Sequence, residues 1–174
     1  MTKAPLTSAR MLQGLGIGAC MALLVSCGGG HDADSSATTA ALPSGVLTDP
    51  ASGGNCAGND LRISRDDFSM VIQGECGNVV ISGSNGVLNL DGARSLRVEG
   101  NNVTVLNEQV GEVVVTGDDT TLNLTIAGPV KVDGDRNLVL AKDIQTLGFS
   151  GNDNTVNTDN DPALDDTGRG NRLL

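Results

Sequence analysis

The chain has 174 residues, 24 of them Gly, with two Phe and neither Trp nor Tyr, so any core must be built from Val, Leu, Ile and Ala. Its formal charge of -10 repels phosphate backbones and argues against a nucleic-acid-binding protein. With 39% hydrophobic residues the chain is too apolar to be wholly disordered, and its shortage of aromatic residues argues against a sugar-stacking cleft.

Residues 1–26 have the layout of a secretory signal peptide. Lys3 and Arg10 precede an apolar stretch over residues 11–25, which is shorter than the roughly 20 residues of a membrane-spanning helix. The stretch ends in Leu24-Val25-Ser26-Cys27, which resembles the lipobox of bacterial lipoproteins. That resemblance implies attachment of a diacylglycerol to Cys27 and cleavage of the chain just before it, with palmitate expected among the acyl groups. An ordinary leader with an incidental Cys27 is the alternative.

Residues 27–54 are interpreted as the lipidated Cys followed by a flexible tether. Gly, Ser, Ala and Thr dominate this segment, and no apolar period runs through it. His31, the single His, lies here beside two Asp and is better interpreted as a solvated linker residue than as a metal ligand. Because Gly28 rather than an acid follows Cys27, resemblance to sorting rules in double-membraned bacteria predicts an outer-membrane anchor facing the periplasm.

A 17-residue repeat organises the rest of the chain. Glycine recurs at this spacing from residue 83 onward, and apolar residues recur at the same spacing in several columns. The glycines are Gly83, Gly100, Gly117, Gly134, Gly151 and Gly168. Each unit contains two stretches in which apolar and polar residues alternate, such as 88–90 and 96–98, and this alternation is typical of short strands. Gly, Asn, Asp and Ser, which favour turns, separate the stretches.

A fixed period without insertions predicts an all-β fold over residues 55–174, a parallel β-helix or β-solenoid with two short strands in each coil. Each residue would lie over its equivalent in the next coil, about 4.8 Å away. We expect six or seven coils, with Asn137, Asn154 and Asn171 stacked in a side-chain ladder. An antiparallel meander or sandwich remains the alternative, since such short strands also suit hairpins.

Cys56 and Cys76 are the two thiols that remain once the leader is removed and Cys27 carries lipid. In an oxidising compartment this pair predicts a disulfide between neighbouring coils, which would clamp the first coil. Two buried, unpaired thiols are the alternative.

A family resemblance rests on the turn-and-strand pattern Gly151-Asn152-Asp153-Asn154-Thr155-Val156 and on residues 76–85. Together with the early Cys pair and the leader, these segments resemble a bacterial family known as domain of unknown function 3060. The resemblance covers residues 56–158 and implies an exported, repetitive β domain. It brings no catalytic residues, and turns such as Gly134-Asp135-Arg136-Asn137 depart from the pattern.

Two groups of charged residues are candidate sites. Asp118, Asp119, Asp135 and Asp153 are weak candidates for calcium ligands, because stacked turns bring carboxylates together. The repeats of calcium-binding solenoids and the EF-hand spacing do not occur in the sequence, so a solvated acidic surface is preferred. We predict no cofactor and no dedicated metal site.

An enzymatic patch would combine charged residues from several coils, as in polysaccharide-active β-helices. Its members are Arg94, Arg97, Lys131, Glu99 and Asp133. Acid–base chemistry would then fall to carboxylates alone, without Tyr, Trp or His in the domain, so we do not expect an enzyme. Leu106 and Leu140, which alternate with Asn at an outward position, are candidates for a contact surface.

These observations predict a membrane-anchored bacterial lipoprotein of the cell envelope that acts as a non-catalytic structural or binding module. Its expected partners are the membrane, through the lipid, and a protein or envelope component that the sequence does not identify. A calcium-binding module and a polysaccharide-active enzyme are the alternatives.

Overall fold

The computed structural model describes residues 45–174, and the predicted leader, Cys27 and most of the predicted tether lie outside the described residues. All regular secondary structure in residues 45–174 is β. The strands are β1 (Val46–Thr48), β2 (Gly54–Asn55), β3 (Asp60–Ile63), β4 (Ser69–Ile81), β5 (Val87–Val98), β6 (Thr104–Val115), β7 (Thr121–Val132), β8 (Leu138–Phe149), β9 (Thr155–Thr158), β10 (Ala163–Asp166) and β11 (Arg172–Leu173). No helix within this part of the chain is long and apolar enough to cross a membrane.

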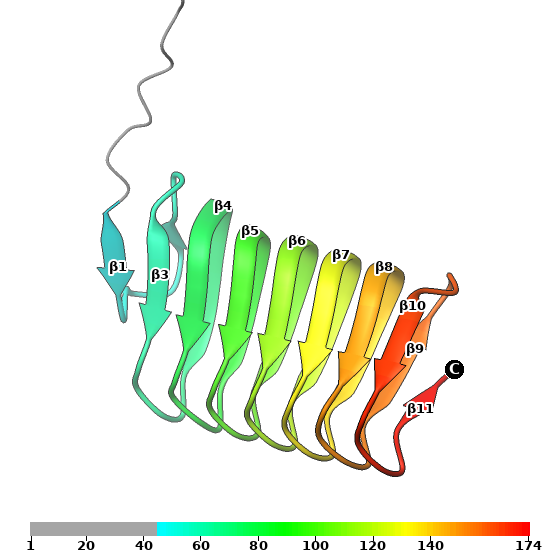
Figure 1. Ribbon diagram of the computed structural model, residues 1–174. Helices are drawn as coiled ribbons and strands as arrows, with labels where there is room; N and C mark the ends of the chain where they lie inside the picture. The colour runs from blue at the N-terminus through cyan, green and yellow to red at the C-terminus, as the bar shows by residue number, and fades with distance from the viewer. Residues whose placement is uncertain (1–44) are drawn as a thin grey trace, which may run out of the picture. The chain divides into compact units, whose positions relative to one another are not determined.

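The chain winds into a parallel β-solenoid of about eight turns (Figure 1). Every pairing between the strands is parallel, and residues 17 apart in sequence are partners in β5 to β9, as Val105, Leu122 and Val139 show. Because a meander would give antiparallel pairs, the predicted solenoid is confirmed and the alternative is wrong.

Two details of the predicted architecture differ from the structure. β4 to β8 are single strands of 12 or 13 residues that bend around a corner, instead of two short strands per coil. Ladder pairing continues through the corner, as Ala93 opposite Val110 shows, so the chain has no reason to leave β conformation there. The solenoid also begins before residue 55, because β1 pairs with β3. Residues 46–48 alternate too briefly to be recognised as a strand.

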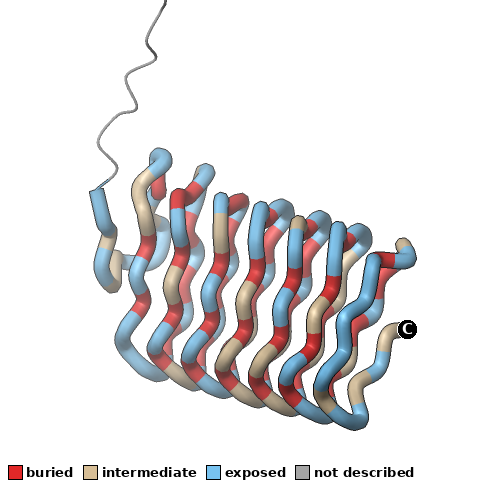
Figure 2. Tube along the Cα trace, viewed as in Figure 1, coloured by how far each residue is buried: buried red, intermediate tan, exposed pale blue. Residues whose placement is uncertain are grey.

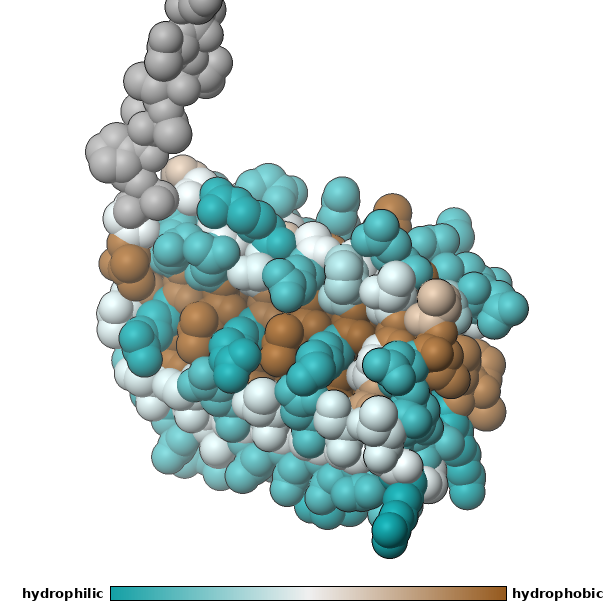
Figure 3. Space-filling view, viewed as in Figure 1, coloured by the Kyte–Doolittle hydropathy of each residue, from teal (hydrophilic) through white to brown (hydrophobic). Residues whose placement is uncertain are grey.

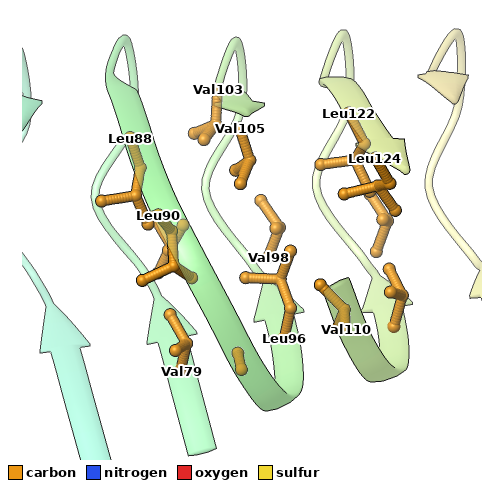
Figure 4. Close-up of a cluster of buried hydrophobic side chains, with 14 of the residues drawn as sticks. Val79, Leu88, Leu90, Leu96, Val98, Val103, Val105, Val110, Leu122 and Leu124 are labelled. Carbon is orange, nitrogen blue, oxygen red and sulfur yellow. The ribbon is translucent and has the colours of Figure 1, made fainter. Parts of the chain in front are cut away.

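The core is a set of apolar columns that run along the stack. Figure 2 shows buried positions alternating with exposed ones along each strand and lining up from coil to coil. Leu88, Val105 and Leu122 form one such column and are fully buried, and Figure 4 shows them on successive coils with their apolar neighbours. Each coil therefore buries its apolar side chains only because the coils on both sides cover them.

The recurrent glycines permit a close approach between coils at the turns. A Cβ on Gly100 would overlap the carbonyl oxygen of Gly83, and one on Gly117 would overlap that of Gly100. Two residues after each of these glycines the backbone is left-handed, with φ between 53° and 57° at Asn85, Asn102 and Asp119. Asn and Asp tolerate this conformation better than most residues, which explains their frequency in the turns.

Candidate binding surface

The front face of the solenoid, turned towards the viewer in Figure 1, is one parallel sheet. β1, β3 and β10 build it together with the C-terminal halves of β4 to β8. Side chains on a strand alternate between core and solvent, so this sheet presents whole columns of outward residues.

Two outward columns run side by side along the front face. The polar column consists of Asp60, Asn78, Ser95, Glu112, Pro129, Thr146 and Ala163. The cationic column consists of Arg62, Val80, Arg97, Val114, Lys131, Gly148 and Asp165. In the cationic column a basic residue stands on every second coil from Arg62 to Lys131. Alternation of this kind keeps like charges about 9.6 Å apart instead of about 4.8 Å, which lowers their repulsion.

A shallow trough lies between these columns. Its floor is the strand backbone at the buried positions Leu61, Val79, Val113, Val130 and Leu147. The surface is hollowed at two separate places, by about 480 Å³ over β6, β7, β8 and β10 and by about 180 Å³ over β1, β3 and β4, and neither hollow includes a residue of β5. Figure 3 shows the apolar floor as a band that runs along the stack between more polar rows.

The charged residues of the predicted enzymatic patch lie on or beside this face, with one exception. Arg97 Nε donates to Glu99 at 2.7 Å, and Lys131 Nζ donates to Asp133 at 2.8 Å. The hydrogen bond from Lys131 lowers the pKa of the Asp133 carboxyl. Arg94 lies within β5 and takes part in neither pair. The structure therefore places two ion pairs on this face two coils apart, with Val114 on the coil between them.

The four candidate calcium ligands lie in the turns and already have roles there. The Asp118 carboxylate accepts the backbone N–H of Asp135 at 2.8 Å, and Asp135 accepts that of Asn152 at 2.7 Å. The Arg136 guanidinium binds Asp119 through two hydrogen bonds of 2.8 Å and lowers the pKa of that carboxyl. Asp153, the fourth, occupies the left-handed turn position. Residues 45–174 contain no group of three or more His, Cys, Asp or Glu arranged to hold a metal ion.

The asparagine ladder predicted from the repeat is present. The side chain of Asn154 accepts the backbone N–H of Asn137 at 2.8 Å, and Asn171 does the same for Asn154 at 2.9 Å. A second ladder passes through Asp118 and Asp135 in the turns, and sequence reasoning missed it. The recurrence of Asn, Asp or Ser directly after each turn glycine from Gly83 to Gly151 was the available signal.

The remaining candidate residues are Cys56 and Cys76, which lie where the solenoid begins, and Leu106 and Leu140, which lie in the N-terminal halves of β6 and β8. Cys56 and Cys76 form a disulfide with 5.0 Å between their Cα atoms, and both are buried. Leu106 is 37% exposed and Leu140 is half-buried, and Asn123 lies between them on the intervening coil, so they form no continuous apolar patch. Sequence reasoning did not identify the trough, although the alternation of Arg97, Val114 and Lys131 in one column is visible in the repeat.

Residues 115–170, which include β7 to β10 and the Lys131 part of the trough, match the model of a family described as Protein of unknown function (DUF3060). These coils are therefore similar to the DUF3060 family. The match confirms the resemblance found in the sequence, and it covers the C-terminal half of the solenoid. Comparison with curated proteins and with solved structures found no match.

Proposed function

We propose that the chain is an exported bacterial lipoprotein, anchored in the cell envelope through Cys27, whose solenoid serves as a non-catalytic binding module. The leader with its lipobox supports the anchor, and Gly28 supports the outer membrane as its location. The trough supplies an extended surface on which a partner could lie.

The disulfide in the first coil is the main observation that supports export of the protein. Cys56 and Cys76 are paired where the solenoid begins, and disulfides persist in oxidising compartments such as the periplasm. The bond joins the corner of the first coil to β4, where fewer neighbouring strands hold the chain than in the middle of the stack. A secreted solenoid gains stability there, whereas a cytosolic chain would not keep the bond.

A binding rather than catalytic role is supported by the state of the carboxylates at the trough. A general acid that works near neutral pH needs a raised pKa, whereas the hydrogen bond from Lys131 lowers the pKa of Asp133. Glu99 is likewise paired with Arg97. Glu99 and Asp133 are therefore suited to orient the Arg97 and Lys131 side chains on the surface.

The test is metabolic labelling of the full chain with an alkyne analogue of palmitate in a double-membraned bacterium, followed by membrane fractionation. We expect label on the wild-type protein and its recovery in the outer-membrane fraction. Cys27→Ser should remove the label and release the protein, while Cys20→Ser, which changes a residue of the leader, should leave both unchanged. Labelling that survives Cys27→Ser would show that the anchor has been assigned to the wrong residue.

A further inference from the structure

The front sheet ends at β10 in an edge to which no strand of residues 45–174 is paired, and the larger hollow of the trough reaches this edge at Leu164 and Asp165. We propose that the edge binds an extended basic segment of a protein partner, which adds to the sheet as one more strand and in which basic and apolar residues alternate. This inference rests on the proposed binding role and adds to it the place of binding and the chemistry of the partner.

The backbone of β10 is available along one side. Within residues 45–174, β10 pairs with β8 alone, and the last strand, β11, pairs with β9 outside the front sheet. A strand directs its N–H and C=O groups to both of its sides, so those on the outer side of β10 have no strand to bond with. All four residues of β10 are exposed, whereas β6 alternates between buried and exposed positions. The edge therefore suits recognition by strand addition.

One core column is left uncovered at this edge. Leu164 pairs with Leu147 in the ladder and continues the column of Val113 and Val130. These three earlier members are at most 2% exposed, whereas Leu164 is 49% exposed. Figure 3 shows apolar surface at this C-terminal end of the stack. An apolar side chain on an added strand would cover Leu164 and extend the core, as each coil does for the coil before it.

The charges around this edge favour a basic partner. Residues 143–168 contain no Lys or Arg. Four acids lie in β10 and in the corner before it: Asp159, Asp161, Asp165 and Asp166. The next basic residues in sequence, Arg169 and Arg172, lie in the following turn and in β11, outside the front sheet. A basic segment is therefore attracted to this part of the front sheet, and the net charge of -10 attracts it from a distance.

Asp165 supplies the closest partner for a basic side chain. It is the only acid in the cationic column, it is exposed, and it makes no ion pair with another residue of 45–174. A residue directly opposite it on an added strand would lie about 5 Å away, within reach of its carboxylate. Because neighbouring residues of a strand face opposite sides, a basic residue opposite Asp165 leaves the next residue to cover Leu164. Alternation of basic and apolar residues follows from this geometry.

The same charges argue against a second copy of this chain as the occupant. Two β10 strands side by side would bring Asp165 and Asp166 of both copies together, and their carboxylates repel each other. The opposite end of the stack is also less suited to a basic segment. There Leu47 of β1 is already half-buried, and β3 beside it carries both Asp60 and Arg62, whose charges cancel. The proposed segment is thus directed to β10.

The experiment measures fluorescence anisotropy of a labelled Ser-Lys-Val-Lys-Val-Lys-Ser peptide with the full chain in detergent. We expect saturable binding that weakens with added salt. A Ser-Glu-Val-Glu-Val-Glu-Ser peptide should not bind. The basic peptide with N-methyl groups on its five central amides keeps every charge but loses its backbone donors, so it should bind about tenfold more weakly.

Variants of the chain test where the peptide binds. Asp165→Asn and Leu164→Ala should each reduce the affinity about threefold, because each removes one cross-strand contact. Glu108→Gln and Leu106→Ala are the matched controls, since they make the corresponding changes at exposed positions in β6. Both controls should leave the affinity unchanged.

The inference is overturned by no binding, by equal binding of the N-methylated peptide, or by unchanged affinity in both edge variants when circular dichroism shows them folded. Self-association of the wild-type chain in sedimentation, lost in Leu164→Ala, would assign the edge to a second copy and also reject the proposal. These results are separable from the lipid-anchor experiment. A chain labelled at Cys27 that ignores the peptide keeps the anchor and loses only this inference, and an unlabelled chain that binds the peptide does the reverse.

Discussion

At the scale of single residues, turn glycines such as Gly117, which the stack requires, differ from Gly148 in strand β8, which it does not require. A Cβ on Gly117 would overlap the carbonyl oxygen of Gly100 in the coil before it, and backbone atoms in the ladder have little freedom to move. A Cβ on Gly148 would have its nearest neighbours at 3.9 Å. An added Cβ should therefore be tolerated at Gly148 but not at Gly117.

We expect Gly117→Ala to lower the free energy of unfolding by about 1–3 kcal/mol, because the added methyl group overpacks the turn. Gly148→Ala is the matched control, and it should leave stability unchanged or raise it slightly, since alanine restricts the unfolded chain. Urea denaturation followed by circular dichroism measures both. Equal stability of the two variants would mean that the turn can relax around a Cβ.

Asn107 is a polar residue at a buried position of the solenoid, where its neighbours are apolar. It occupies an inward position between Leu90 and Leu124 in neighbouring coils and is 7% exposed, and neither of its side-chain amide atoms has a hydrogen-bond partner. The adjacent Leu106 points outward, where the neighbouring coils have Asn89 and Asn123. The apolar and polar residues of this coil are thus exchanged.

Replacement of Asn107 by Leu should raise the free energy of unfolding by about 1–3 kcal/mol, because it removes an unsatisfied buried amide and continues the leucine column. Asn123→Leu makes the same change at an exposed position and should alter stability by less than about 0.5 kcal/mol. Thermal and urea unfolding of the two variants measure these changes in the free energy of unfolding. A loss of stability in Asn107→Leu would indicate that the buried amide has a partner, such as an internal water.

At the scale of elements, an aspartate at the end of the first and of the last strand of the front sheet binds a turn, Asp49 that of the next coil and Asp166 its own. Asp49, directly after β1, accepts the Ser64 N–H at 2.8 Å, the Ser64 hydroxyl at 2.6 Å and the Arg65 N–H at 3.3 Å. Asp166, at the end of β10, accepts the Gly168 N–H and the Asn171 side-chain amide, both at 2.9 Å. Asp166 pairs with Phe149 in the ladder, so it terminates a core column with a charge. Charged ends of this kind oppose edge-to-edge aggregation.

The Asp49 contacts predict a dependence of stability on pH. Hydrogen bonds from Ser64 lower the pKa of this carboxyl in the folded chain, so the ionised form favours folding. Its contribution is complete above the ordinary pKa of an Asp and is lost as the pH falls through the lower, folded-state pKa. Asp49→Asn should reduce stability at neutral pH and flatten the decline in acid, and Ser64→Ala should do so in part. Melting temperatures measured from neutral to acidic pH would contradict this if wild type and Asp49→Asn declined in parallel.

At the scale of the whole molecule, stability comes from contacts between neighbouring coils. β5, β6 and β7 each pair along nearly their whole length with the strand before and the strand after, and β8 pairs with β7 on one side and, at its two ends, with β9 and β10 on the other. A fold of this kind behaves approximately as a one-dimensional array, in which one interior unit can be removed if the remaining units stay in register.

Deletion of residues 104–120, one repeat of 17, should therefore give a folded protein with a lower melting temperature, since Val103 would be followed by Thr121 in the equivalent position. Deletion of residues 104–119 removes one residue fewer and leaves the following strand out of register at the junction, which turns core side chains towards solvent. Circular dichroism and limited proteolysis should show a cooperative β fold for the first variant and not for the second. Equal folding of both would argue against strict register between the coils.

The sequence by itself determined the repeat, the β class, the inward columns such as Leu88, Val105 and Leu122, and the asparagine ladder, because each of these follows from one period applied to local alternation. The tertiary structure alone decided that the strands of β4 to β8 continue around the corner, that residues 46–48 join the sheet, that the buried amide of Asn107 has no hydrogen-bond partner, and that two outward columns enclose a trough. These features depend on how each coil closes and on which side chains from different coils become neighbours. A period fixes which residues stack, whereas the shape between columns is set only when the coils have packed.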